Sequence, residues 1–254
     1  MKHLIVTGDD FGRSHEVNEA IERSHAAGFL TQASLMVNEP CAEEAVRIAQ
    51  RHPGLCVGLH LTLCDGQAST VSAITNEAGE FVVSPARAGL RYAFGSSLAG
   101  ALLQEIRAQF ERFRTLGCLP TYWDGHAHLH LHPTILRLAL PVAVAHGFHA
   151  LRLVREPGSW APLSQIFQWL SGAAIRTLRQ YSLTFTDHTF GLRDTGRMTT
   201  EIGIRILQAL PDSVSEFYFH PGAEPSEIDY ARLIAVLETE GITLCTSLPP
   251  PAGR

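Results

Sequence analysis

The 254-residue sequence has no continuous apolar run that approaches the roughly 20 residues of a membrane-spanning helix. It also has no long run of Lys and Arg, and its formal net charge is -5, so it offers no electrostatic surface for a nucleic-acid backbone. We therefore expect no nucleic-acid partner, and any membrane contact should be peripheral. The apolar segment 3–6 is too short for a secretory signal, which predicts a cytoplasmic protein. The inner face of the membrane is one option for its place in the cytoplasm.

Closely spaced cysteine pairs are also missing. The five cysteines are scattered, and none forms the C-x-x-C pattern of zinc ribbons or redox sites. We expect them to be small buried apolar groups. With 45% hydrophobic and 18% charged residues and no internal repeat, the composition is typical of a globular protein, and the length suits a single domain over residues 1–254. The oligomeric state stays open, a homodimer included.

What is present is an alternation of strand-like and helical segments along the whole chain. The segment 3–7 has the character of a buried strand, and 15–27 has a helical period, with Ser14 as its N-cap and Gly28 at its end. We count seven or eight such units, which predicts an α/β fold with a mainly parallel sheet. The length is common among single α/β barrels.

The remaining elements follow the same alternation. Further strands are expected near 32–37, 56–63, 121–124, 149–154, 182–185, 215–219 and 243–246, and further helices near 40–52, 98–116, 133–146, 164–181, 200–209 and 227–240. The segment 65–97 is rich in small residues and predicts a long active-site loop with a small hairpin. The segment 157–198 is predicted to be a lid or an insertion. Within it, the apolar positions of 160–178 recur at helical spacing. They indicate either core packing or an exposed apolar face at a membrane surface.

Charged and imidazole side chains gather at the predicted carboxyl ends of different strands. They are Asp9, Asp10, His60, His126, Arg152 and His220. In a β/α barrel these strand ends share one face, and that face carries the active site, so residues distant in sequence would converge. The alternative is that polar residues follow strands simply because loops are polar.

The adjacent carboxylates of Asp9 and Asp10 repel each other unless a cation lies beside them. A divalent metal ion would supply that charge, whereas an Asp pair that caps the first helix is the competing interpretation. His60 is also ambiguous, because a lone histidine in the apolar segment 57–62 is more often a hydrogen-bonded core residue than a ligand.

A histidine tract follows the strand predicted at 121–124. It places His126, His128, His130 and His132 at alternate positions. An extended segment would put all four on one face, whereas in a helix only the pairs four apart would be neighbours. Not all four can bind one ion, and we expect at least one of them to be functional.

Taken together, these motifs resemble the YdjC/ChbG-like carbohydrate deacetylases over nearly the whole chain. The matching segments are Val6–Gly12, Gly58–His60, Asp124–His130 and Phe219–Pro221. The resemblance implies a distorted, TIM-like (β/α) barrel with one divalent metal ion, either Mg²⁺ or Zn²⁺. It makes Asp10, His60 and His126 the metal ligands, Asp9 the catalytic base and His220 the general acid.

A finer resemblance is to the branch associated with hopanoid biosynthesis. It is carried by the segments 33–37, 105–110, 130–134 and 154–157. It implies that the substrate is an N-acetylglucosaminyl hopanoid glycolipid, which loses its N-acetyl group. We assign Arg152, His128 and His130 to substrate binding. For Arg152 the alternatives are that it orients Asp9 or that it forms a structural ion pair. The alternatives are a soluble N-acetylglucosamine oligosaccharide such as chitobiose, another metal-dependent hydrolase such as a phosphoesterase, and a noncatalytic metal- or sugar-binding protein.

Overall fold

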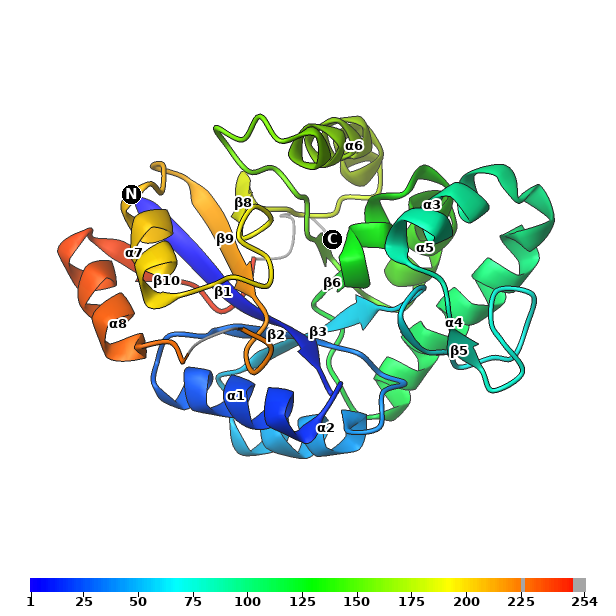
Figure 1. Cartoon of the computed structure of the whole chain (residues 1–254), viewed down its shortest axis with the longest axis horizontal. Helices are drawn as coiled ribbons and strands as arrows, with labels where there is room; N and C mark the ends of the chain where they lie inside the picture. Colours follow the sequence, from blue (N-terminus) through cyan, green and yellow to red (C-terminus); the bar gives the residue numbers. More distant parts are fainter. Residues whose placement is uncertain (225–226, 249–254) are drawn as a thin grey trace.

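A curled sheet of parallel strands lies at the centre of the molecule (Figure 1). The computed structural model describes residues 1–224 and 227–248. Seven strands follow in the order β7-β6-β3-β2-β1-β9-β8, and β10 pairs with the first residues of β1. Their bounds are β1 Lys2–Phe11, β2 Gln32–Leu35, β3 Cys56–Leu61, β6 Tyr122–Gly125, β7 Ala150–Leu151, β8 His188–Phe190, β9 Val214–Phe219 and β10 Ile242–Leu244. Every pair in this sheet is parallel, which confirms the predicted α/β fold.

The sheet curls into a distorted, TIM-like half-barrel. β7 and β8 stand at the two ends of the strand order and, in the part of the chain that the structure describes, do not pair with each other. An isolated parallel bridge joins Ala150 of β7 to Thr184. The strand predicted at 182–185 is therefore wrong, because only this single bridge forms there, and β8 is a strand that the sequence did not indicate.

The helices surround the sheet (Figure 1). They are α1 His15–Ala26, α2 Ala42–Arg51, α3 Pro85–Phe94, α4 Ala99–Thr115, α5 Pro133–Ala145, α6 Pro162–Gln180, α7 Thr200–Gln208 and α8 Tyr230–Thr239, with 3₁₀ segments η1 Ser96–Leu98 and η2 His126–Leu131. α1 begins as predicted, because the Ser14 side chain accepts a hydrogen bond from the Val17 amide, and Gly28 follows its end with φ +84°.

β7 is much shorter than the strand predicted at 149–154. Beyond Arg152, whose amide still donates to the Trp123 carbonyl of β6, the backbone finds side-chain partners in place of a neighbouring strand. The Ser171 hydroxyl bonds both the amide and the carbonyl of Val154, and Thr189 donates to the Leu153 carbonyl at 2.5 Å. These long-range contacts end the strand although Leu153 and Val154 are apolar.

The segment 65–97 contains the expected hairpin, formed by β4 Gly66–Gln67 and β5 Glu80–Phe81. The prediction missed α3, which Pro85 opens in the first turn of the helix. Glu105 of α4 fixes the start of the loop, since its buried carboxylate accepts hydrogen bonds from the Ser69 and Thr70 amides, each at 2.8 Å.

The apolar stripe of α6 is divided between the core and the surface. Ala174 and Leu178 are buried, as the core-packing interpretation requires. Upstream, the four large apolar side chains Trp160, Leu163, Ile166 and Trp169 are 89, 56, 53 and 69% exposed. No helix among the described residues has the length and apolar character that would let it cross a bilayer.

We predict that Gly58→Ala lowers the free energy of unfolding. A Cβ atom at Gly58 of β3 would lie 2.5 and 2.6 Å from two ring carbons of the buried Tyr122, and such overpacking typically costs about 1–3 kcal/mol. Urea unfolding would measure the change. Gly172→Ala on α6 is the matched control, because nothing lies within 4 Å of its added methyl group; equal stability of the two variants would contradict the prediction.

Candidate metal centre

Asp9 and Asp10 lie near the carboxyl end of β1 and contact different partners. β1 continues to Phe11, so the pair belongs to the strand end and not to a helix cap. The register between β1 and β2 shifts between Gly8 and Phe11, and Asp10 has a φ of +64°. Such a left-handed residue other than glycine persists only where its surroundings fix it. Asp10 faces His60 and His126, whereas Asp9 faces Arg152.

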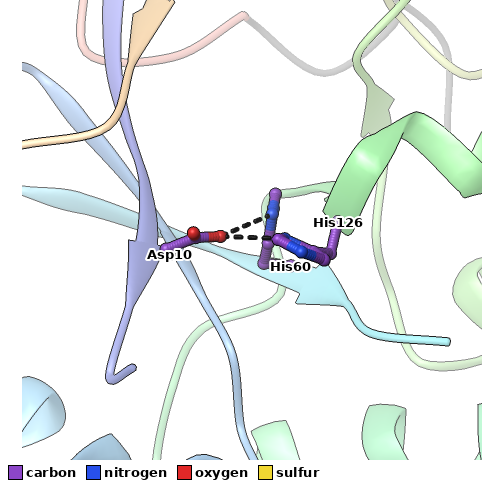
Figure 2. A group of neighbouring side chains, drawn as sticks. All are labelled: Asp10, His60 and His126. Atoms are coloured by element: carbon purple, nitrogen blue, oxygen red, sulfur yellow. Dashed lines mark hydrogen bonds and ion pairs between the residues drawn. The ribbon is translucent and has the colours of Figure 1, made fainter. Parts of the chain in front are cut away.

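Three predicted ligands converge from separate elements (Figure 2). Asp10 Oδ1 lies 3.0 Å from His126 Nδ1 and 3.3 Å from His60 Nε2. The three ligand atoms lie within 4.8 Å of one another. Asp10 comes from β1, His60 from β3 and His126 from the start of η2, so the strand ends do meet at one face as the barrel predicts.

The chemistry of these donors fits a divalent cation. His60 Nδ1 lies 2.7 Å from Asp124 Oδ1, so a neutral ring donates its proton there and keeps a lone pair on Nε2. Burial opposes a second proton on this ring, but Asp124 and Asp10 raise the pKa of His60 to about 10. A bound cation would take the place of that proton, which otherwise faces the Asp10 oxygen. Ligands about 2.0–2.1 Å from a tetrahedral ion are about 3.3 Å apart, close to the observed 3.0 and 3.3 Å.

Asp10 is held as an anion. Burial opposes its ionisation, but the imidazoles of His126 and His60 keep the pKa of its carboxyl well below the usual value. The Asp124 carboxylate behind His60 corresponds to the carboxylate–histidine pairs that orient metal ligands. Its own pKa is lowered against the effect of burial by Arg152 and His60.

Arg152 is the cation for the neighbouring carboxylates. Its fully buried guanidinium bonds Asp9 through two contacts of 2.7 and 2.8 Å, Asp124 at 2.9 Å and Glu216 at 2.9 Å. Burial raises the pKa of Glu216, and Arg152 opposes that rise. Asp9, His60 and Asp124 could also group around an ion, but Arg152 already neutralises both carboxylates, so the Asp10 group is the better site.

The histidine tract is neither extended nor a regular helix. Ala127 and His128 have φ values of +50° and +57° inside η2, so neither of the two regular arrangements considered for the four histidines applies. His126 faces Asp10, whereas His128 Nε2 lies 2.8 Å from the Tyr218 hydroxyl. His130 is fully buried and donates from Nε2 to the Arg152 carbonyl at 3.0 Å. Substrate binding by His128, His130 and Arg152 stays a prediction.

His220 lies at the same edge of the sheet, directly after β9. Phe219 is the register partner of Gly8, so His220 follows next to the Asp pair. Its amide donates to Glu224, and its ring meets that of Tyr218 edge-on at 6.1 Å. Among the described residues its ring makes no hydrogen bond to the metal ligands, and its role as a general acid stays a prediction.

Sequence reasoning missed Asp124 and Glu216. Asp124 carried a signal, because it ends a predicted strand two residues before His126. Glu216 carried a weaker one, a charged residue within the apolar strand β9. Only the fold shows that both meet Arg152.

Comparison with known proteins gives a consistent assignment. A family model described as YdjC-like protein matches residues 3–241. A carbohydrate deacetylase of Brevibacillus brevis is 34% identical over 224 residues, which cover 86% of this chain and 80% of that protein. A chitooligosaccharide deacetylase of Serratia marcescens is 36% identical over 157 residues, which cover 61% of this chain and 60% of that protein. With some curated relatives the alignment thus spans only about half to three fifths of their length.

A solved structure shares the fold. It is a crystal structure of an Enterococcus faecalis protein with a proposed role in cellobiose-phosphate cleavage. The TM-score is 0.69 at 21% sequence identity, with 96% of this chain and 97% of that chain covered.

We predict that Asp124→Asn weakens metal binding about 10–100-fold, because the carboxylate that orients His60 is lost. Isothermal titration with Zn²⁺ and Mg²⁺ would measure the dissociation constant. Asp212→Asn, at a side chain that is 78% exposed, should leave it unchanged. Wild-type affinity in Asp124→Asn would show that this pair does not orient a ligand.

A second prediction concerns acid stability. Burial lowers the pKa of His130 to about 4, below its ordinary value of about 6.5. The unfolded chain therefore takes up the proton first as the pH falls from about 6.5 to 4, which should remove up to about 3 kcal/mol of the free energy of unfolding. Urea unfolding between pH 7 and 4.5 should show a flatter profile for His130→Gln than for wild type or His149→Gln; parallel profiles would contradict this assignment.

Proposed function

This chain belongs to the YdjC-like family, and on that premise we propose that it is a metal-dependent carbohydrate deacetylase. Such an enzyme is a hydrolase that acts on the amide bond of an N-acetylated sugar. The observation that carries the proposal is the convergence of Asp10, His60 and His126 beside a second carboxylate, Asp9, which Arg152 holds outside this group of three. The names of the deacetylase relatives support the carbohydrate substrate.

Amide hydrolysis needs help at both ends, because water is a weak nucleophile and an amine anion is a poor leaving group. A divalent ion held by Asp10, His60 and His126 would supply Lewis-acid activation of water and stabilise charge on the acetyl oxygen. Asp9 accepts a proton from the water that attacks the acetyl carbon. His220 donates a proton to the nitrogen as the C–N bond breaks, which releases acetate and the free amine.

Arg152 holds Asp9 for this role. The two contacts of 2.7 and 2.8 Å fix the plane of the carboxylate, and each of its oxygens keeps further lone-pair capacity to accept a proton. A base fixed in this way stays next to the ligands without itself joining them. The second carboxylate of the pair, Asp10, is left for the two histidines.

Acetate release from N-acetylglucosaminyl substrates tests the proposal. Chelation should abolish release, and added Zn²⁺ or Mg²⁺ should restore it. Asp9→Asn should reduce kcat about 100–10,000-fold, the usual contribution of a general base, while metal content stays at the wild-type level. Asp212→Asn is the control. A folded, metal-loaded protein that releases no acetate from any such substrate would refute the proposal.

The finer proposal is that the acetylated sugar is linked to a lipid of the hopanoid class. An apolar cavity of about 330 Å³ lies between α5 and α6, and its lining includes Leu131, Leu136, Leu140 and Trp169. Leu131 ends the same η2 turn that begins with His126. Trp169 of this lining is also one of the exposed apolar side chains of α6, and Trp160, two residues before the helix, is exposed as well. An apolar aglycone at the cytoplasmic face of a membrane suits these surfaces better than a free oligosaccharide does.

The double substitution Trp160→Ser and Trp169→Ser separates the two substrate classes. It should reduce liposome flotation and lower kcat/KM for a lipid-linked N-acetylglucosamine, because both exposed indoles are removed. Activity on soluble N,N′-diacetylchitobiose should not change. Equal flotation of variant and wild type, or wild-type activity that is higher on the soluble disaccharide, would favour the oligosaccharide alternative that the Serratia marcescens relative suggests.

A further inference from the structure

An ion pair between Arg13 and Asp65 borders the metal ligands. Arg13 Nη2 lies 3.1 Å from Asp65 Oδ2, and Arg13 Nη1 lies 3.3 Å from Asp10 Oδ2. The same Asp65 oxygen lies 3.7 Å from His126 Nε2. Because His126 Nδ1 faces Asp10 Oδ1, the four side chains form a closed ring that contains two of the three ligands.

This ring gives His126 a second carboxylate neighbour, as Asp124 is for His60, at the longer distance of 3.7 Å against 2.7 Å. In each histidine one nitrogen faces Asp10 and the other faces a second carboxylate. His126 is the more exposed ring, at 13% against 2% for His60. It therefore has fewer packing contacts to fix it, and a carboxylate partner matters more for its orientation.

Backbone strain gathers at the same place. Among the described residues, five other than glycine have a positive φ, and four of them lie in the ring or directly after His126: Asp10, Asp65, Ala127 and His128. Such conformations are unfavourable for residues other than glycine, and they cluster where function requires a set geometry. The left-handed backbone at Asp65 and Asp10 thus contributes to placing both carboxylates beside Arg13.

The backbone on both sides of Asp65 in the sequence is also anchored. It follows β3 within four residues, and the next residues are anchored because Gln67 donates its amide to Glu39 at 2.8 Å and Ser69 donates to Glu105 at 2.8 Å. The carboxylate is therefore presented by a fixed segment although its side chain is 61% exposed.

We propose that Asp65 and Arg13 are positioning residues for the metal ligands, an inference that rests on the metal site of the proposed function. The Asp65 carboxylate, 3.7 Å from His126 Nε2, attracts the ring proton to that nitrogen and so leaves Nδ1 for the ion. Arg13 occupies Asp10 Oδ2 and leaves Oδ1 to the ion. Neither residue touches the substrate in this role; both act through a ligand.

Metal binding by the Asp65 variants tests this without any activity assay. Asp65→Ala should weaken Co²⁺ binding about 10–100-fold and change the visible absorption of the bound Co²⁺, and Asp65→Glu should restore most of both. Thermal unfolding of the metal-free variants should change little, because exposed ion pairs contribute little to stability. Glu111→Ala is the matched control, since Glu111 forms a similarly exposed pair with Arg114 on α4.

Arg13→Gln should weaken Co²⁺ binding in the same way, and Arg13→Lys should rescue it only in part, because an ammonium group cannot bridge two carboxylates as a planar guanidinium does. Arg114→Gln is its control. Wild-type affinity and an unchanged Co²⁺ spectrum in both Asp65→Ala and Arg13→Gln would overturn this inference alone. Failure of the wild-type protein to bind Co²⁺, or equal binding by His60→Ala, would overturn the metal site and the inference together.

Discussion

One buried guanidinium holds the centre of this barrel together. Arg152 pairs with Asp9 from β1, Asp124 from β6 and Glu216 from β9. Buried charges are costly unless they are paired, and without Arg152 three carboxylates would face one another in the core. The pairing therefore fixes how the carboxyl ends of these strands meet. Because the proposed metal centre is built at these strand ends, the pairing also determines where its side chains lie.

Arg152 also explains how two adjacent carboxylates acquire different tasks. Asp9 is bound to the guanidinium, whereas the left-handed backbone at Asp10 sends the second carboxylate to His60 and His126. Two titratable groups in different environments are the usual way for one site to separate its chemical roles. In the proposed deacetylase, the first carboxylate serves as the base and the second as a ligand.

The local sequence pattern was sufficient to predict the parallel α/β fold, because strand-like and helical segments alternate along the chain. It was also sufficient to predict that Asp10, His60 and His126 meet, because the carboxyl ends of the strands in such a fold share one face. It was insufficient where distant contacts decide the backbone. The turn at His128 depends on Tyr218 of β9, and the early end of β7 depends on hydroxyl groups far along the chain. Asp9 was among the partners considered for Arg152, but Asp124 and Glu216 could not be assigned, since buried ion pairing leaves no periodic signal.

Anomalous X-ray diffraction from crystals of the Zn²⁺-loaded protein is the most direct test of the metal centre. The account predicts one strong peak about 2.0–2.2 Å from Asp10 Oδ1, His60 Nε2 and a nitrogen of His126. A peak bound elsewhere, with these three side chains turned away from one another, would contradict it.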